Sequence, residues 1–137
     1  MSEIATGILD LKAVSGHLDA RYGAGPTKVW YQRPEYFRDG GMGYAWLQMR
    51  GMLPAIGDLG RSHVCVGAVD ETDLEEIYSL FQAHRWSPKG EARPLIERLG
   101  LRHTSMVVGD VIEHPAGFFL VDGLGFKRLL WRGGVPV

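Results

Sequence analysis

The side chains in this sequence that could carry out chemistry are its histidines, its single cysteine and a polar stretch near residue 103. His63, His84, His103 and His114 are dispersed, with no His-x-x-x-His pair, and Cys65 is the only cysteine. A zinc site needs three or four such ligands brought together by the fold. The spacing therefore predicts no metal site and favours histidines that make local hydrogen bonds.

Cys65 lies among valines in a stretch that alternates like a strand. A thiol in that setting usually behaves as a small buried hydrophobic group rather than as a nucleophile. One cysteine also excludes an intramolecular disulfide and fits a reducing compartment.

The stretch from His103 to Asp110 holds Thr104, Ser105 and, before the aspartate, Gly109. Catalytic serines usually sit on strained turns flanked by glycines, whereas Ser105 is expected to open a strand. A glycine inside a β-rich run indicates a bend, and an aspartate beside it is expected to accept local N–H groups. We predict no catalytic residue here, with a small hydrolase-type enzyme built on His103 and Asp110 as an alternative.

Charged residues gather at three places, which we predict to be partner-binding. The acidic group begins a predicted helix, and two basic groups lie beside aromatic residues; such mixtures are common at protein interfaces and in nucleic-acid-binding proteins. The acidic residues are Asp70, Glu71, Asp73, Glu75 and Glu76. The basic residues are Arg33, Arg38, Lys127, Arg128 and Arg132.

Composition limits the function classes. The 137 residues fit one domain, 1–137, with 45% hydrophobic and 23% charged residues. The net charge of −1 argues against a general nucleic-acid coat. No signal peptide or membrane-length apolar run is recognisable, so we expect a cytoplasmic protein. The glycine-rich stretches lack a phosphate-loop lysine, and no cofactor is predicted.

The elements that must position these residues form an α+β pattern. Strands are expected at 28–32 and 62–69, followed by a three-stranded meander within 105–131. Helical patterns cover 8–22 and the segment after Thr72, where Thr72 and Glu75 form a predicted capping box. We expect a curved, mostly antiparallel sheet with helices packed on one side.

The meander resembles the YodL-like small domain of bacterial mobile-element proteins. The residues that carry the likeness are 103–112 (His-Thr-Ser-Met-Val-Val-Gly-Asp-Val-Ile), 119–122 (Phe-Leu-Val-Asp) and 125–127 (Gly-Phe-Lys), within the C-terminal half. Val107 stands where that family usually has serine. The resemblance implies a plasmid or phage accessory protein that binds a component of its bacterial host, and it supplies no catalytic mechanism.

The expected function is therefore non-enzymatic. The protein would bind a host macromolecule, with inhibition of a bacterial defence system such as CRISPR as the role implied by the mobile-element likeness. A protein partner comes first, and a nucleic-acid-binding accessory protein that uses the arginine and aromatic groups is an alternative. No membrane or metal partner is expected.

Overall fold

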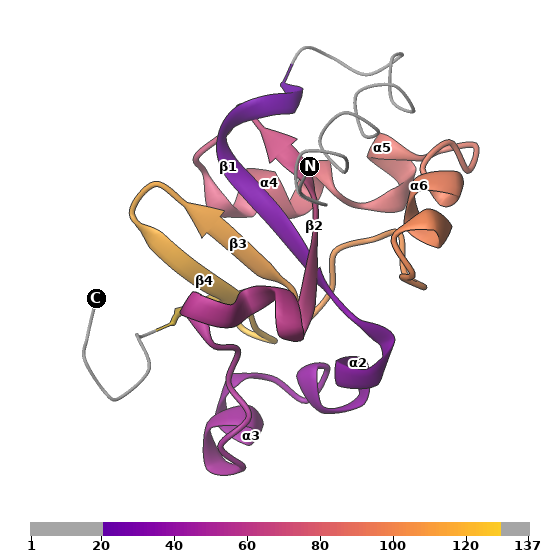
Figure 1. Ribbon diagram of the computed structural model, residues 1–137. Helices are drawn as coiled ribbons and strands as arrows, with labels where there is room; N and C mark the ends of the chain where they lie inside the picture. Colours follow the sequence, from indigo (N-terminus) through magenta and orange to yellow (C-terminus); the bar gives the residue numbers. More distant parts are fainter. Residues whose placement is uncertain (1–20, 130–137) are drawn as a thin grey trace.

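A computed structural model of the chain describes residues 21–129 and is built on a five-stranded sheet (Figure 1). Every neighbouring pair of strands is antiparallel, and their order is β2-β1-β3-β4-β5. The strands are β1 (Tyr22–Gln32), β2 (His63–Val69), β3 (Val111–His114), β4 (Gly117–Val121) and β5 (Phe126–Arg128). The expected α+β class and the C-terminal meander, formed by β3, β4 and β5, are confirmed.

Short helices occupy the two long connections between strands. We call the connection between β1 and β2, residues 33–62, the helical excursion. It contains α2 (Pro34–Gly40), α3 (Tyr44–Met49) and the 3₁₀ helix η1 (Ile56–Arg61). The connection between β2 and β3 contains α4 (Leu74–Leu80), α5 (Ala83–Trp86) and α6 (Arg93–Arg98), followed by an irregular loop, residues 99–110.

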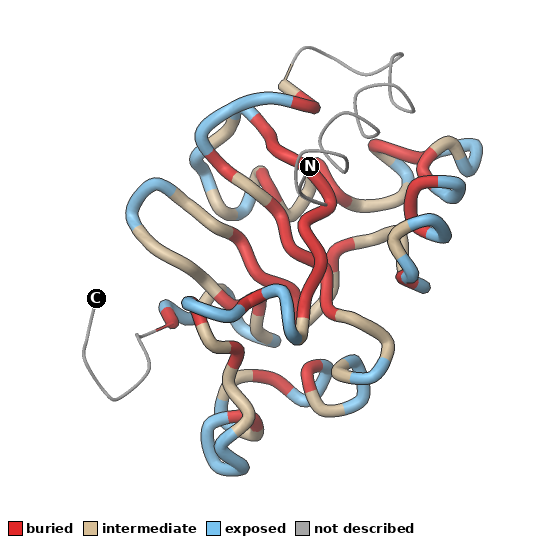
Figure 2. Tube along the Cα trace, viewed as in Figure 1, coloured by how far each residue is buried: buried red, intermediate tan, exposed pale blue. Residues whose placement is uncertain are grey.

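Both faces of the sheet are buried, because successive side chains of each strand point to opposite sides. On one face Val29, Tyr31 and Ile112 pack with residues of α4, α5 and α6. On the other face Trp30 and Val111 pack with residues of α3 and η1 and with Leu129, which follows β5. All seven residues of β2 are buried, and this strand is red along its length in Figure 2.

The prediction that helices pack on one side of the sheet is therefore only half correct. It holds for α4, α5 and α6, but the opposite face is covered by Leu47, Ile56 and Leu59 of the excursion. Pro54, Gly57 and Gly60 disfavour regular structure in residues 52–60. Tertiary packing of Ile56 and Leu59 provides the apolar contacts that favour a short 3₁₀ helix there.

The first strand begins earlier than its sequence indicates. The strand was expected at 28–32, but the glycines and proline at 23–26 also lie inside β1, where the pairing register shifts and both Tyr22 and Thr27 lie opposite Val69. Gly25, with φ of +145°, lies so close to the backbone of Asp70 that any Cβ would clash. The extra residues form a bulge, which tolerates the glycines and proline. Of the helix predicted at 8–22, residues 8–20 lie outside the described part.

Two local predictions also need correction. The start of α4 is capped by Asp73, whose side chain accepts the N–H of Glu76, rather than by a Thr72–Glu75 box. The strand expected from residue 105 begins only at Val111, because Gly109 (φ +101°) turns the chain immediately before it. The predicted bend at Gly109 is thus confirmed, and it ends the loop instead of interrupting a strand.

Candidate functional site

Three of the buried polar residues in the described chain, Gln32, His63 and Asp110, lie where the end of β1 meets the loop before β3. Asp110 is fully buried and its carboxylate is surrounded by donors. Oδ1 accepts the backbone N–H of Gln32 at 2.9 Å, and Oδ2 accepts that of Val107 at 2.9 Å. The predicted local role of Asp110 is therefore confirmed by the Val107 contact, and the carboxylate also ties the loop to the sheet.

His103 completes the surroundings of this carboxylate. Its Nε2 lies 3.1 Å from Oδ1 and 3.0 Å from Oδ2 of Asp110. The imidazole stacks on the Tyr31 ring, with centroids 4.5 Å apart, and the Phe37 ring meets it edge-on at 4.9 Å. Its other nitrogen, Nδ1, is buried and has no hydrogen-bond partner within the described residues. The ring is thus held in one orientation by a carboxylate and two aromatic side chains.

A second buried histidine holds the same loop from β2. His63 Nε2 donates to the Gly109 carbonyl at 2.8 Å, and its Nδ1 accepts from the Ser62 hydroxyl at 2.7 Å. Burial lowers the pKa of His63 from 6.5 to about 4, which keeps the ring neutral near pH 7. The amide of Gln32 adds a bond to the Val108 carbonyl at 2.8 Å. We call Gln32, His63, His103, Gly109 and Asp110 the buried junction.

The hydroxyl of Tyr31 fixes the first part of the loop. It donates to the Thr104 carbonyl at 2.6 Å, and the Trp86 indole N–H reaches the same oxygen at 3.0 Å. Burial raises the pKa of Tyr31 well above its usual value, so the hydroxyl remains a donor. These contacts at Thr104, together with those of the buried junction at Gly109 and Asp110, hold the irregular loop 99–110 against the sheet.

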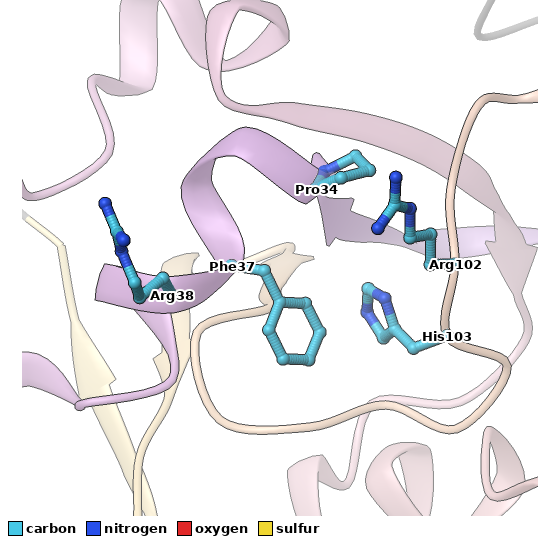
Figure 3. A pocket seen from close by; sticks show the side chains of 5 residues that line it. All are labelled: Pro34, Phe37, Arg38, Arg102 and His103. Atoms are coloured by element: carbon cyan, nitrogen blue, oxygen red, sulfur yellow. The ribbon is translucent and has the colours of Figure 1, made fainter.

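A cavity of about 370 Å³ opens beside His103 (Figure 3). It is lined by Pro34, Phe37 and Arg38 of α2 and by Arg102 and His103 of the loop. In the close-up, Phe37 and His103 face each other, Arg102 lies between His103 and Pro34, and the Arg38 side chain points away from both rings. Asp110 is behind the imidazole, bonded to its Nε2, and does not line the cavity. We call this cavity the His103 pocket.

The geometry bears on the alternative of an enzyme based on His103 and Asp110. The two side chains do meet, which the sequence had left open. However, Nε2 of His103 is directed to Asp110 and Nδ1 is buried, so neither nitrogen faces a ligand in the pocket. The hydroxyl of Ser105 accepts the N–H of Ala83 at 2.8 Å instead of facing the imidazole. This arrangement anchors a loop, and it lacks the nucleophile–base contact that acyl transfer needs.

The predicted partner-binding residues lie at three separate places. The acidic group follows the end of β2 at Val69, and Arg33 and Arg38 follow the opposite end of the paired strand β1. Lys127 and Arg128 are on β5, the edge strand farthest from β2. Arg132 lies outside the described residues. In the fold, however, Glu75 of the acidic group lines a hollow together with Asp122 and Phe126, directly before Lys127, so the acidic group adjoins the group on β5.

Within the acidic group, most carboxylates have internal contacts. Glu71 accepts the N–H groups of Thr72 and Asp73, which lowers its pKa, and Arg21 lies 3.2 Å from it. Asp73 caps α4, and Glu76 is 3.1 Å from Arg21 and 3.7 Å from Arg85. Asp70 and Glu75 are exposed. The cluster therefore largely serves the helix start, where negative charge is favoured.

Most of the basic residues also have contacts within the fold. The Arg33 guanidinium donates twice to the Gly60 carbonyl, and Arg128 donates to the Ala116 carbonyl while lying over the Phe119 ring. Lys127 lies 3.9 Å from Asp122. Among the described residues, Arg38 has no ion pair or hydrogen bond, and the same holds for Arg102, which sequence reasoning did not select.

The excursion exposes apolar side chains that the sequence did not mark as functional. Phe37, Met42 and Met49 are three of the four large apolar residues that are exposed in the described chain, the fourth being Leu124. Figure 2 shows the exposed turns of α3 projecting from the end of the sheet. Local sequence gives no signal of which apolar side chains tertiary packing leaves uncovered.

The predicted burial of Cys65 is confirmed. Cys65 is 2% exposed in the middle of β2, and burial raises its pKa to about 12, so the thiol is not activated. Over residues 21–129, no cluster of three or more histidine, cysteine or acidic side chains could hold a metal ion. None of the helices in that range has the length and apolar content needed to cross a bilayer.

Comparison with protein-family models, curated proteins and solved structures gives no match to this chain.

Proposed function

We propose that this protein is a small non-enzymatic binding protein that docks on a protein partner through the helical excursion. The observation that supports this most strongly is the concentration of Phe37, Met42 and Met49, exposed by 36%, 58% and 73%, within one short segment. Large exposed apolar side chains are uncommon in such density on a free surface, and they typically mark interaction sites.

The chemistry of the segment fits a protein interface. Methionine side chains are flexible and adapt to apolar pockets, and tryptophan and arginine are the residues most enriched at binding hot spots. Arg50 lies over the Trp46 ring, 4.9 Å from its centroid, so the pair offers a charged and apolar edge next to the exposed Met49. The matching partner surface would be apolar at its centre with acidic groups at its rim.

The excursion is also held firmly enough to present these side chains. Leu47 of α3 is fully buried against the sheet, and the hydroxyl of Tyr36 donates to the Met52 carbonyl at 2.7 Å. The Asp122 carboxylate accepts the N–H of Tyr44 at 3.1 Å at the start of α3. A preorganised surface loses less conformational entropy on binding than a mobile one.

The class of partner that we propose rests on the resemblance of the C-terminal half to mobile-element proteins and not on geometry. A mobile-element accessory protein that binds a bacterial host component would act on a protein such as an effector of a defence system. In that role the His103–Asp110 pair holds the fold together and the excursion makes the contact.

The test compares two variants of the full chain as bait in bacterial lysate. We expect the double variant Met42→Glu, Met49→Glu to lose a protein that the unchanged chain captures reproducibly. The control Leu124→Glu alters an 87% exposed leucine in the turn between β4 and β5 and should retain it. Equal capture by all three baits, or equal loss with both variants, would contradict the proposal.

The defence role has its own test. Expression of the unchanged chain in a bacterium with an active CRISPR system should restore plaque formation by a targeted phage, and the Met42→Glu, Met49→Glu variant should not. Restoration by neither protein would remove CRISPR inhibition from the proposal, while the capture result would still decide partner binding.

A further inference from the structure

The His103 pocket combines apolar walls with an arginine that has no partner in the described chain. The Phe37 ring, 36% exposed, faces the imidazole of His103, and Pro34 belongs to the same lining (Figure 3). Arg102 lies between His103 and Pro34 and is exposed. Within residues 21–129 its guanidinium group has no hydrogen bond or ion pair, so it is free to bind an anion.

The carboxylates closest to the pocket along the chain are directed elsewhere. Glu35 of α2 lines a separate cavity that is formed by the excursion alone. Asp39 accepts the indole N–H of Trp46 at 3.4 Å, and Asp110 lies behind the imidazole. None of the five residues that line the pocket is acidic. The charge of Arg102 is therefore unbalanced at the pocket, and a ligand with a negative group would complement it.

The number of available cations distinguishes between anions. Arg38 also lines the pocket, but its side chain points away from both rings, which leaves Arg102 as the cation beside them. A carboxylate carries one charge and forms a bidentate pair with a single arginine. A phosphate monoester carries nearly two charges near pH 7, and Arg102 alone would leave one of them unpaired. The lining therefore favours a carboxylate.

The location of the pocket favours a carboxylate that belongs to a protein. Phe37 lines the pocket and is also one of the exposed apolar side chains of the excursion, so a partner seated on the excursion would reach the pocket. A volume of about 370 Å³ is within the usual range for binding sites and accommodates a bulky apolar side chain. Interface hot spots typically consist of such an anchor in a pocket, with arginine and aromatic residues enriched around it.

We propose that the His103 pocket receives a bulky apolar side chain from an acidic segment of the protein partner, with Arg102 bound to a neighbouring aspartate or glutamate. This inference rests on the proposed function and names the chemistry of the segment that the partner offers. Asp110 and Tyr31 serve the site by position, because they fix the imidazole that forms one wall.

The test is selection of peptides that bind the full chain from a random library displayed on phage. We expect enrichment of peptides that place an aromatic or large aliphatic residue beside an aspartate or glutamate. Fluorescence polarisation then measures the affinity of a synthetic copy of one enriched peptide. Arg102→Gln should weaken its binding about tenfold, because a charge-assisted contact is lost. The matched control Arg93→Gln, at an exposed arginine of α6 outside the pocket, should leave binding unchanged.

An exchange of charges separates direct contact from a general effect of charge. Arg102→Glu should abolish binding of the acidic peptide and should bind a peptide in which lysine replaces the acidic residue. Replacing the apolar residue of the original peptide by alanine should weaken binding to the unchanged chain by about tenfold as well, because the pocket then stays empty. The proposal is overturned if no peptide is enriched, if the enriched peptides lack acidic residues, or if Arg93→Gln and Arg102→Gln weaken binding equally.

Failure of this inference can be distinguished from failure of the proposed function. The Met42→Glu, Met49→Glu variant changes no residue that lines the pocket, so it should bind the short peptide like the unchanged chain while losing the captured protein. Arg102→Glu should weaken capture of that protein too. Loss of capture in the methionine variant together with full capture by Arg102→Glu would retain the proposed function and overturn the pocket inference.

Discussion

The buried junction and the helical excursion adjoin the same end of β1, and they reverse the usual distribution of side chains. In the junction, polar groups such as Asp110 and His63 are fully buried. In the excursion, apolar groups such as Met42 and Met49 face solvent. Each arrangement by itself raises the free energy of the folded chain, since buried polar groups lose hydration and exposed apolar groups remain in contact with water.

The difference lies in how the two costs are offset. The Asp110 carboxylate has donors from Gln32, Val107 and His103, so its burial is compensated within the fold. The methionines of the excursion have no such compensation in the free chain, and binding to another surface would supply it. Changes in the junction should therefore alter stability, whereas changes on the excursion surface should alter association.

The largest effect is expected from Asp110→Ala. The substitution leaves the buried N–H groups of Gln32 and Val107 without their acceptor and removes the partner of His103. The free energy of unfolding should fall by about 4 kcal/mol, measured by urea denaturation. Asp58→Ala, which removes a surface carboxylate 3.3 Å from Arg61, should change it by less than about 0.5 kcal/mol. Similar losses of unfolding free energy in both variants would show that the buried Asp110 carboxylate contributes no more to stability than a surface carboxylate.

Gly109→Ala should be the next most damaging change. The glycine has φ of +101°, and an added Cβ would lie 2.5 Å from the Gln32 side chain and 2.7 Å from the Gly40 backbone. Backbone strain and the clash should together lower the free energy of unfolding by about 3 kcal/mol. Gly60→Ala has no atom within 4 Å of its Cβ and provides the control. A stable Gly109→Ala protein would show that the loop can shift away from the sheet.

The pH dependence of stability tests the buried histidine. Folded His63 stays neutral down to about pH 4, whereas in the unfolded chain it takes up a proton near pH 6.5. Between these values the unfolded state binds more protons, so stability is full above pH 6.5 and falls as the pH approaches 4. The loss attributable to His63 is on the order of 3 kcal/mol.

His63→Gln isolates that contribution, because glutamine has an amide donor and does not titrate. Denaturant unfolding at pH 4.5 and pH 7 should show a smaller pH effect in this variant than in the unchanged chain. An identical pH effect in both proteins would assign the acid sensitivity to the carboxylates instead.

The smallest stability effect is expected on the excursion surface. Met49→Gln, at a side chain that is 73% exposed, should change the free energy of unfolding by less than about 0.5 kcal/mol. Leu47→Ala, two residues earlier on α3 and fully buried, should lower it by about 3 kcal/mol. Thermal denaturation of the pair measures both. A large loss in Met49→Gln would place that methionine in the core and weaken the proposed interface.

Much of the fold could be predicted because its signals are local. The meander was expected within 105–131, and its turns at 114–117 and 123–125 contain proline and glycine, which set the backbone angles without help from distant residues. The burial of Cys65 and the bend at Gly109 follow from neighbours in the chain in the same way. The α+β class is the sum of these local preferences.

The sequence by itself thus determined the elements and the reason that Asp110 accepts nearby N–H groups. Only the tertiary structure decided what the elements bring together. The bond from Gln32 to Asp110 spans 78 positions, and that from His63 to Gly109 spans 46. The placement of His103 beside Phe37 and the exposure of Met42 and Met49 also depend on how the chain folds back, because local spacing carries no information about distant packing.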